Sequence, residues 1–138
     1  IALEVANAGL AASKRTDEDV DELNAVLADM DHEVGTETVG EKQDMRFHLT
    51  LARATHNSIM VKLLETISSQ VELTIRETRR VQLYANKEIA RQLWHEHKAI
   101  ADAVADRDPE RAQEEMRRHL KHVETEITNY LKRKKGGG

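Results

Sequence analysis

Apolar residues along most of the chain recur every three or four positions, which is the spacing of one face of an α-helix. This pattern predicts six helices, over residues 1–12, 17–32, 41–55, 58–84, 87–106 and 109–132. The connections between them are short, so consecutive helices are expected to run antiparallel. The pattern therefore predicts an all-α fold, an antiparallel helical bundle.

Residues that commonly cap helices stand at the predicted boundaries. The candidate N-caps are Thr16, Asn57 or Ser58, Asn86 and Asp108. Asp19 lies three residues after Thr16, which is the spacing of a capping box, and Pro109 takes the first helical position after Asp108. Residues 35–40, GTETVG, are the most loop-like interior stretch.

The composition narrows the class of protein. A net charge of −4 argues against strong nucleic-acid binding by this chain alone, because neutralising phosphates requires a clustered basic surface. The absence of cysteine excludes disulfides and thiolate metal ligands. No run of 18 apolar residues is present, so no membrane-spanning helix is expected. One domain is predicted over 1–132, followed by a disordered basic and glycine-rich tail over 133–138.

The histidines fall on different faces of the predicted helices. A helix turns about 100° per residue, which places His97 on the apolar stripe of the fifth helix and His119 at the edge of the stripe of the sixth. Asp44 and His48 are four residues apart and share one face of the third helix. His95 points away from the stripe and should face solvent.

These polar residues have two interpretations. A single histidine on an apolar stripe is more often a hydrogen-bonded core residue than a metal ligand. Three histidines beside a carboxylate can instead share one divalent ion, which would satisfy all of them at once, and such ligands suit zinc, nickel, manganese or iron. A mononuclear metal enzyme and a helical interaction module without a site both stay open. The enzyme lacks an obvious general base, and HEHKA is not HExxH because Ala99 replaces the second histidine.

Several longer motifs follow one another along the chain: LAAS, DMRFHLTLARATHN and HEHKAIADAVADRDPERAQEEMRRHL. Their order, from about Leu3 to Leu131, resembles the C-terminal effector-binding domain of FadR-type GntR transcription regulators, the FCD domain. The resemblance implies a bundle with a central pocket, a homodimer, a cytoplasmic location and a role in regulation rather than catalysis. Operator DNA would be bound only by a winged-helix domain that precedes this one in the family.

The resemblance also implies a ligand set. Many members hold one divalent metal through an aspartate and three histidines, which correspond here to Asp44, His48, His97 and His119. Zinc is our first expectation, with nickel, manganese and iron as alternatives. A small carboxylic acid completes the coordination shell in the family, and Asn57 matches an asparagine near the pocket.

The effector contacts are predicted less directly. The inward row of the fourth helix turns from apolar to polar at Thr74 and Thr78, which either line the effector pocket or face a wetter end of the bundle. Relatives carry an arginine four residues before the glutamate that matches Glu4, and this position would fall before Ile1. If the threonines line the pocket, the effector is a small hydroxy acid, dicarboxylic acid or sugar acid.

Overall fold

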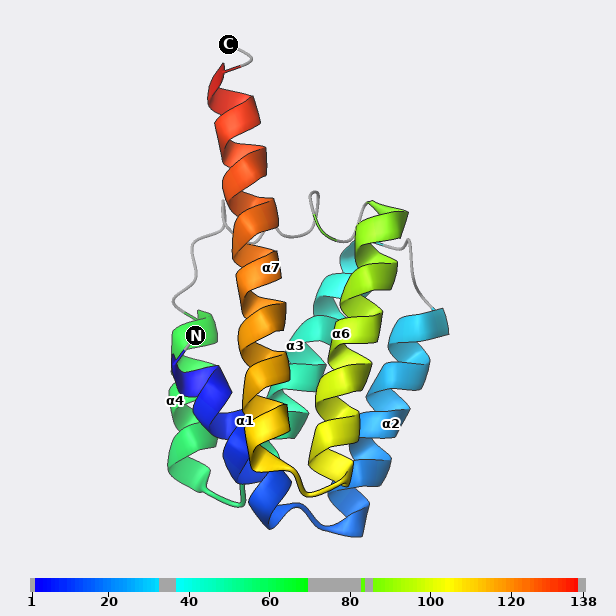
Figure 1. Ribbon diagram of the computed structural model, residues 1–138, viewed down its shortest axis with the longest axis vertical. Coiled ribbons are helices and arrows are strands. Elements are labelled where there is room, and N and C mark those ends of the chain that lie inside the picture. The colour runs from blue at the N-terminus through cyan, green and yellow to red at the C-terminus, as the bar shows by residue number, and fades with distance from the viewer. Residues whose placement is uncertain (1, 33–36, 70–82, 84–85, 137–138) are drawn as a thin grey trace.

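The computed structural model describes residues 2–32, 37–69, 83 and 86–136, and within these ranges the regular structure is helical (Figure 1). The helices are α1 (Ala2–Lys14), α2 (Asp17–His32), α3 (Glu37–Arg53), α4 (Ser58–Ser69), α6 (Lys87–Ala105) and α7 (Pro109–Gly136). The predicted all-α bundle is confirmed. None of the described helices is long and apolar enough to cross a membrane.

Two helix boundaries that the structure describes differ from the predicted ones by four residues. The third helix begins at Glu37, inside the stretch that was predicted to be a loop, because a helix tolerates an internal glycine such as Gly40 at a cost of about 1 kcal/mol. The last helix continues to Gly136, so the tail expected to be disordered from residue 133 is helical as far as 136. Basic residues near a helix C-terminus favour such an extension because they interact well with the helix dipole.

The predicted caps are confirmed. Thr16 and Asp19 form a reciprocal capping box, in which the Asp19 N–H donates to Thr16 Oγ1 at 3.2 Å and the Thr16 N–H donates to Asp19 Oδ2 at 2.8 Å. The side-chain oxygens of Asn57, Asn86 and Asp108 accept hydrogen bonds from backbone N–H groups of the helices that follow, at 3.0, 3.1 and 3.1 Å. Local sequence therefore starts these helices without help from distant contacts.

A tight turn makes α6 and α7 antiparallel neighbours. Arg107 has a positive φ of 55°, and the Asp108 N–H donates to the carbonyl of Ala103 at 3.0 Å. This is the Schellman pattern that commonly ends a helix. The short turn between Ala105 and Pro109 then sends α7 back along α6, and the C-terminal end of α7 projects past α6 (Figure 1).

The apolar core lies between α1, α2, α3, α6 and α7, with Phe47, Ile100 and Met116 fully buried in it. The Trp94 Nε1–H donates to the carbonyl of Leu27 at 2.8 Å and ties α6 to α2. Helix α4 packs mainly against α3 and lies at the edge of the bundle. Its exposed apolar residues include Ile59, at 67% exposure.

Candidate metal centre

Asp44, His48, His97 and His119 converge in the interior from α3, α6 and α7. One potential ligand atom from each residue lies within 4.8 Å of the corresponding atoms of the other three. His97 and His119 are 0% and 2% exposed, and His48 is 9% exposed. The four positions picked out by helical facing and by the family motifs therefore meet at one place.

The Asp44 carboxylate is the common neighbour of two imidazoles. Its Oδ1 lies 3.3 Å from His48 Nε2 and 2.9 Å from His97 Nε2. The second contact is short but does not have the angles of a hydrogen bond, and His97 Nε2 is buried without a hydrogen-bond partner. A buried imidazole nitrogen in this position is costly unless another group, such as a metal ion, accepts its lone pair.

Helix geometry and packing together orient the cluster. Asp44 and His48 share a face because they are one helical turn apart on α3. Phe47, between them in sequence and fully buried, packs on the His97 ring with 4.7 Å between ring centroids. The His97 and His119 rings lie 4.4 Å apart by centroid. The rings are therefore held by α6–α7 packing and by one buried phenylalanine.

A second carboxylate stands behind His119. Glu96 Oε1 lies 2.7 Å from His119 Nδ1, and Glu96 Oε2 lies 2.6 Å from His122 Nδ1. His122 Nε2 is in turn 3.4 Å from Glu126 Oε1. Because Nδ1 of His119 faces Glu96, Nε2 is the nitrogen left to face Asp44 and the other histidines.

The electrostatics of the cluster match the needs of a metal site. Burial alone would raise the pKa of Asp44, but the close polar and charge interactions with His48 and His97 hold this pKa well below its usual value. Burial lowers the pKa of His119 to about 4, helped by the neighbouring His97 and opposed by Glu96. At neutral pH Asp44 is therefore ionised and His119 neutral, which are the protonation states that bind a metal.

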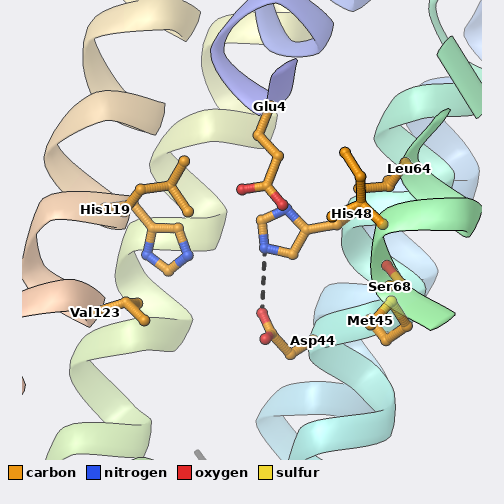
Figure 2. Close-up of a pocket in the computed structure, with 10 residues that line it drawn as sticks. Glu4, Asp44, Met45, His48, Leu64, Ser68, His119 and Val123 are labelled. Atoms are coloured by element: carbon orange, nitrogen blue, oxygen red, sulfur yellow. Dashed lines mark ion pairs between the residues drawn. The ribbon is translucent and has the colours of Figure 1, made fainter. Parts of the chain in front are cut away.

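A small cavity adjoins the cluster. It has a volume of about 100 Å³, and Figure 2 shows Glu4 of α1 pointing toward His48, with Asp44 and His119 nearby. Leu64 and Ser68 of α4 line its other side. Five of its lining residues also border a larger groove of about 370 Å³ between α1, α4 and α7, which gives the cavity a route to the surface.

The family model of the FCD domain matches residues 1–122, nearly the whole of the chain. The chain belongs to the FCD domain family. The family predicted from the sequence motifs is thereby confirmed, and the Asp-His-His-His cluster lies within the matched region.

Three curated relatives resemble this FCD domain. The HTH-type transcriptional regulator LutR of Bacillus subtilis is 36% identical over 94% of the chain. The Uxu operon transcriptional regulator of Escherichia coli is 30% identical over 89%, and the putative L-lactate dehydrogenase operon regulatory protein of the same species is 26% identical over 67%. The chain spans 59%, 49% and 35% of these three proteins, respectively.

Among the other predicted site residues, the structure describes only Asn57, which does not join the cluster. Asn57, predicted to lie near the effector, is exposed and caps α4. Thr74 and Thr78 lie outside the described residues. His95 is exposed, as its facing predicted, and His56 pairs with Asp19 at 2.7 Å on the surface.

Two residues near the FCD cluster were not identified as site residues from the sequence. Glu4 corresponds to a glutamate of the family, but its position in the wall of the cavity was not predicted. Glu96 was not singled out, although it immediately precedes His97. Its pairing with His119 depends on the register between α6 and α7, which no spacing within one helix reveals.

Proposed function

We propose that this FCD domain is the effector-sensing part of a transcription regulator and that it holds one divalent metal ion through Asp44, His48, His97 and His119. The observation that carries this proposal is the convergence of four potential ligand atoms within 4.8 Å in the interior. Membership of the FCD family and the similarity to transcriptional regulators of Bacillus subtilis and Escherichia coli support the regulatory role.

Zinc is the first candidate for the ion, with nickel, manganese and iron as alternatives. Three imidazoles and one carboxylate are borderline ligands that suit all four metals, so availability contributes to the choice. The residues fit such an ion because His97 Nε2 is buried without a hydrogen-bond partner and Asp44 is held in its ionised form. The ion would supply a positive centre at which an acidic effector can bind.

The proposed effector is a small hydroxy acid, dicarboxylic acid or sugar acid. A six-coordinate ion held by these four residues would have two positions left, and a carboxylate with a neighbouring hydroxyl could occupy both. The cavity of about 100 Å³ is far below the roughly 300–1,000 Å³ of pockets for drug-sized ligands, which favours a compact molecule. One relative is named for the L-lactate dehydrogenase operon, which agrees with a small hydroxy acid.

Glu4 and Ser68 line the cavity and are placed to contact the effector. Thr74 and Thr78 follow α4 in the sequence and remain proposed contacts. Asn57 also remains a proposed contact, and its side chain is exposed and caps α4 in the structure.

The regulatory mechanism that we propose is a shift between two arrangements of a homodimer. Effector binding favours one arrangement and so changes the spacing of two DNA-binding domains, which would precede this domain in each subunit. Operator DNA is therefore contacted only through those domains, in the cytoplasm. A two-fold dimer is expected by light scattering at micromolar concentration, and a monomer would contradict this part of the proposal.

Metal analysis tests the central claim. Protein purified without chelators should contain close to one divalent ion per chain by inductively coupled plasma mass spectrometry. Affinity should fall as the pH is lowered, because protons compete with the metal for imidazole nitrogens. A chain that takes up no divalent metal when dialysed against zinc, nickel, manganese and iron in turn would overturn the proposal.

Calorimetry tests the effector. A panel of small hydroxy acids, dicarboxylic acids and sugar acids should include at least one that binds metal-loaded protein and fails to bind metal-stripped protein. Equal affinity for the two forms would make the metal structural and would place the carboxylate on protein groups instead. Mass spectrometry of denatured protein should identify any acid that is retained through purification.

One observation favours a metal-dependent enzyme as the alternative: the Glu4 carboxylate lines the cavity without belonging to the ligand set, which is where a general base would stand. The regulatory proposal predicts that the bound acid is recovered unchanged. Turnover of the acid by metal-loaded protein, lost in Glu4→Gln, would favour the enzyme.

A further inference from the structure

Glu96 joins two histidines of α7 through its two carboxylate oxygens. One oxygen lies 2.7 Å from His119 Nδ1, and the other lies 2.6 Å from His122 Nδ1. The Glu96 side chain is 25% exposed, whereas His119 is only 2% exposed. The carboxylate therefore reaches from the half-buried seam between α6 and α7 toward the interior cluster.

The contact determines which nitrogen of His119 carries its proton. An ionised carboxylate can only accept hydrogen bonds, so Nδ1 of His119 must donate to it. In a neutral imidazole the other nitrogen, Nε2, then has its lone pair free. With Nδ1 engaged by Glu96, Nε2 is the nitrogen that remains available to the cluster, so the Nδ1–H tautomer is the one suited to binding a metal.

His97 offers a contrast within the same cluster. Its Nδ1 is buried without a hydrogen-bond partner, and its ring packs against Phe47 with 4.7 Å between centroids. Packing holds His97, whereas a charged hydrogen bond holds His119. Removing the Glu96 carboxylate should therefore change the orientation and tautomer of His119. The His97 ring should stay in place against Phe47.

We propose that Glu96 is a positioning residue of the metal centre, which orients His119 and keeps it in the Nδ1–H tautomer. The inference rests on the proposed metal site. His122 donates to the second oxygen of Glu96 and is itself flanked by Glu126, so it steadies the carboxylate from the outer side of α7. Carboxylates that orient metal-bound histidines typically change metal affinity by about 10–100-fold when they are removed.

A purely structural alternative is that Glu96 only links α6 to α7. Measurements on three variants separate the two roles. Glu96→Gln keeps the shape of the side chain but loses its charge, and His122→Ala removes the residue that contacts Glu96 from the outer side. His95→Ala is a control at an exposed position next to Glu96 in the sequence. For each protein, cobalt affinity is measured by competition with a chromophoric chelator, together with the visible spectrum of the cobalt complex and the urea midpoint of the metal-free form.

Glu96→Gln is expected to weaken cobalt binding by about 10–100-fold and to alter the cobalt spectrum. His122→Ala should weaken binding less, and His95→Ala should match the wild type. If Glu96→Gln lowers the urea midpoint while affinity and spectrum stay unchanged, Glu96 is only a link between helices and the proposal is overturned. If the wild type binds no cobalt, zinc, nickel, manganese or iron, the proposed metal function fails first, and the role of Glu96 fails with it.

Nitrogen NMR of the wild-type protein supplies a readout that depends neither on metal nor on folding of a variant. Long-range ¹⁵N–¹H correlations of the metal-free protein should show His119 as the Nδ1–H tautomer. The Nε2–H tautomer at His119 would overturn the proposal even if every variant failed to fold.

Discussion

The same two side chains, histidine and aspartate, pair in two regions of this protein with different consequences. In the interior, His97 lies 2.9 Å from Asp44, and two more histidines surround the carboxylate. On the surface, His56 lies 2.7 Å from Asp19, which also completes the capping box of α2. The distances are similar, but the His97 side chain is 0% exposed and that of His56 is 49% exposed.

The comparison shows that a short histidine–carboxylate contact does not by itself mark a metal site. In the surface pair, the Thr16 N–H also donates to the carboxylate, and the half-exposed imidazole of His56 is accessible to solvent. In the interior, three imidazoles and a carboxylate converge at buried positions, so that a shared ion would satisfy several buried groups together. Burial and convergence distinguish the two regions, and the following predictions test that distinction.

The largest expected effect is the loss of metal binding when one interior histidine is replaced. His97→Gln should weaken zinc affinity by more than about 100-fold, since loss of a ligand exceeds the loss of a supporting contact. His56→Gln should leave affinity unchanged. Zinc competition with a chromophoric chelator measures both variants, with circular dichroism to confirm that they fold. Equal losses in the two variants would contradict the distinction between interior and surface.

Metal binding should also stabilise the fold through the interior cluster. A ligand that binds only the folded state at roughly 1,000 times its dissociation constant adds about 4 kcal/mol to the free energy of unfolding. Urea unfolding with zinc and with a chelator should show this difference in the wild type and in His56→Gln. The difference should vanish in His97→Gln. Identical curves for loaded and stripped wild-type protein would count against a metal held by folded residues.

Acidification should destabilise the metal-free protein through His119. Its pKa falls from 6.5 in the unfolded chain to about 4 in the folded protein, so between these values the unfolded state binds more protons. The free energy of unfolding should therefore decrease as the pH falls from about 6.5 to about 4, by about 3 kcal/mol for this group. Urea midpoints across this range should change less in His119→Gln. An equally steep change in that variant would assign the effect to other groups.

The smallest change in stability is expected at the capping box that Thr16 forms with Asp19 of the surface pair. Thr16→Ala removes one half of the α2 capping box and should cost about 1 kcal/mol of stability. Zinc affinity should not change, because this cap lies outside the cluster of ligand atoms. Chemical denaturation and chelator competition measure the two quantities on the same sample. A clear loss of zinc affinity would show that the two regions are coupled.

Much of the fold was predictable because its signals are local. Apolar spacing and the caps at Thr16, Asn86 and Asp108 predicted most helix starts. The start of α3 at Glu37 and the extension of α7 to Gly136 were missed, because glycine and a basic run are only weak breakers of a helix that the rest of the chain favours.

The sequence by itself determined which side chains share a helical face. Asp44 and His48 meet because residues four apart stack on one side of a helix, and His97 is buried because it replaces an apolar residue in a stripe. The family motifs agree with this facing, so the four cluster residues are predictable without knowledge of any contact between helices.

The tertiary structure decided how the helices meet. It brought Glu96 to His119, placed His56 against Asp19, and put Asn57 at an exposed position where it caps α4. The physical reason is that helix geometry relates residues only a few positions apart. The register between two helices instead depends on how all their side chains pack against each other, and the spacing of residues within one helix does not determine it.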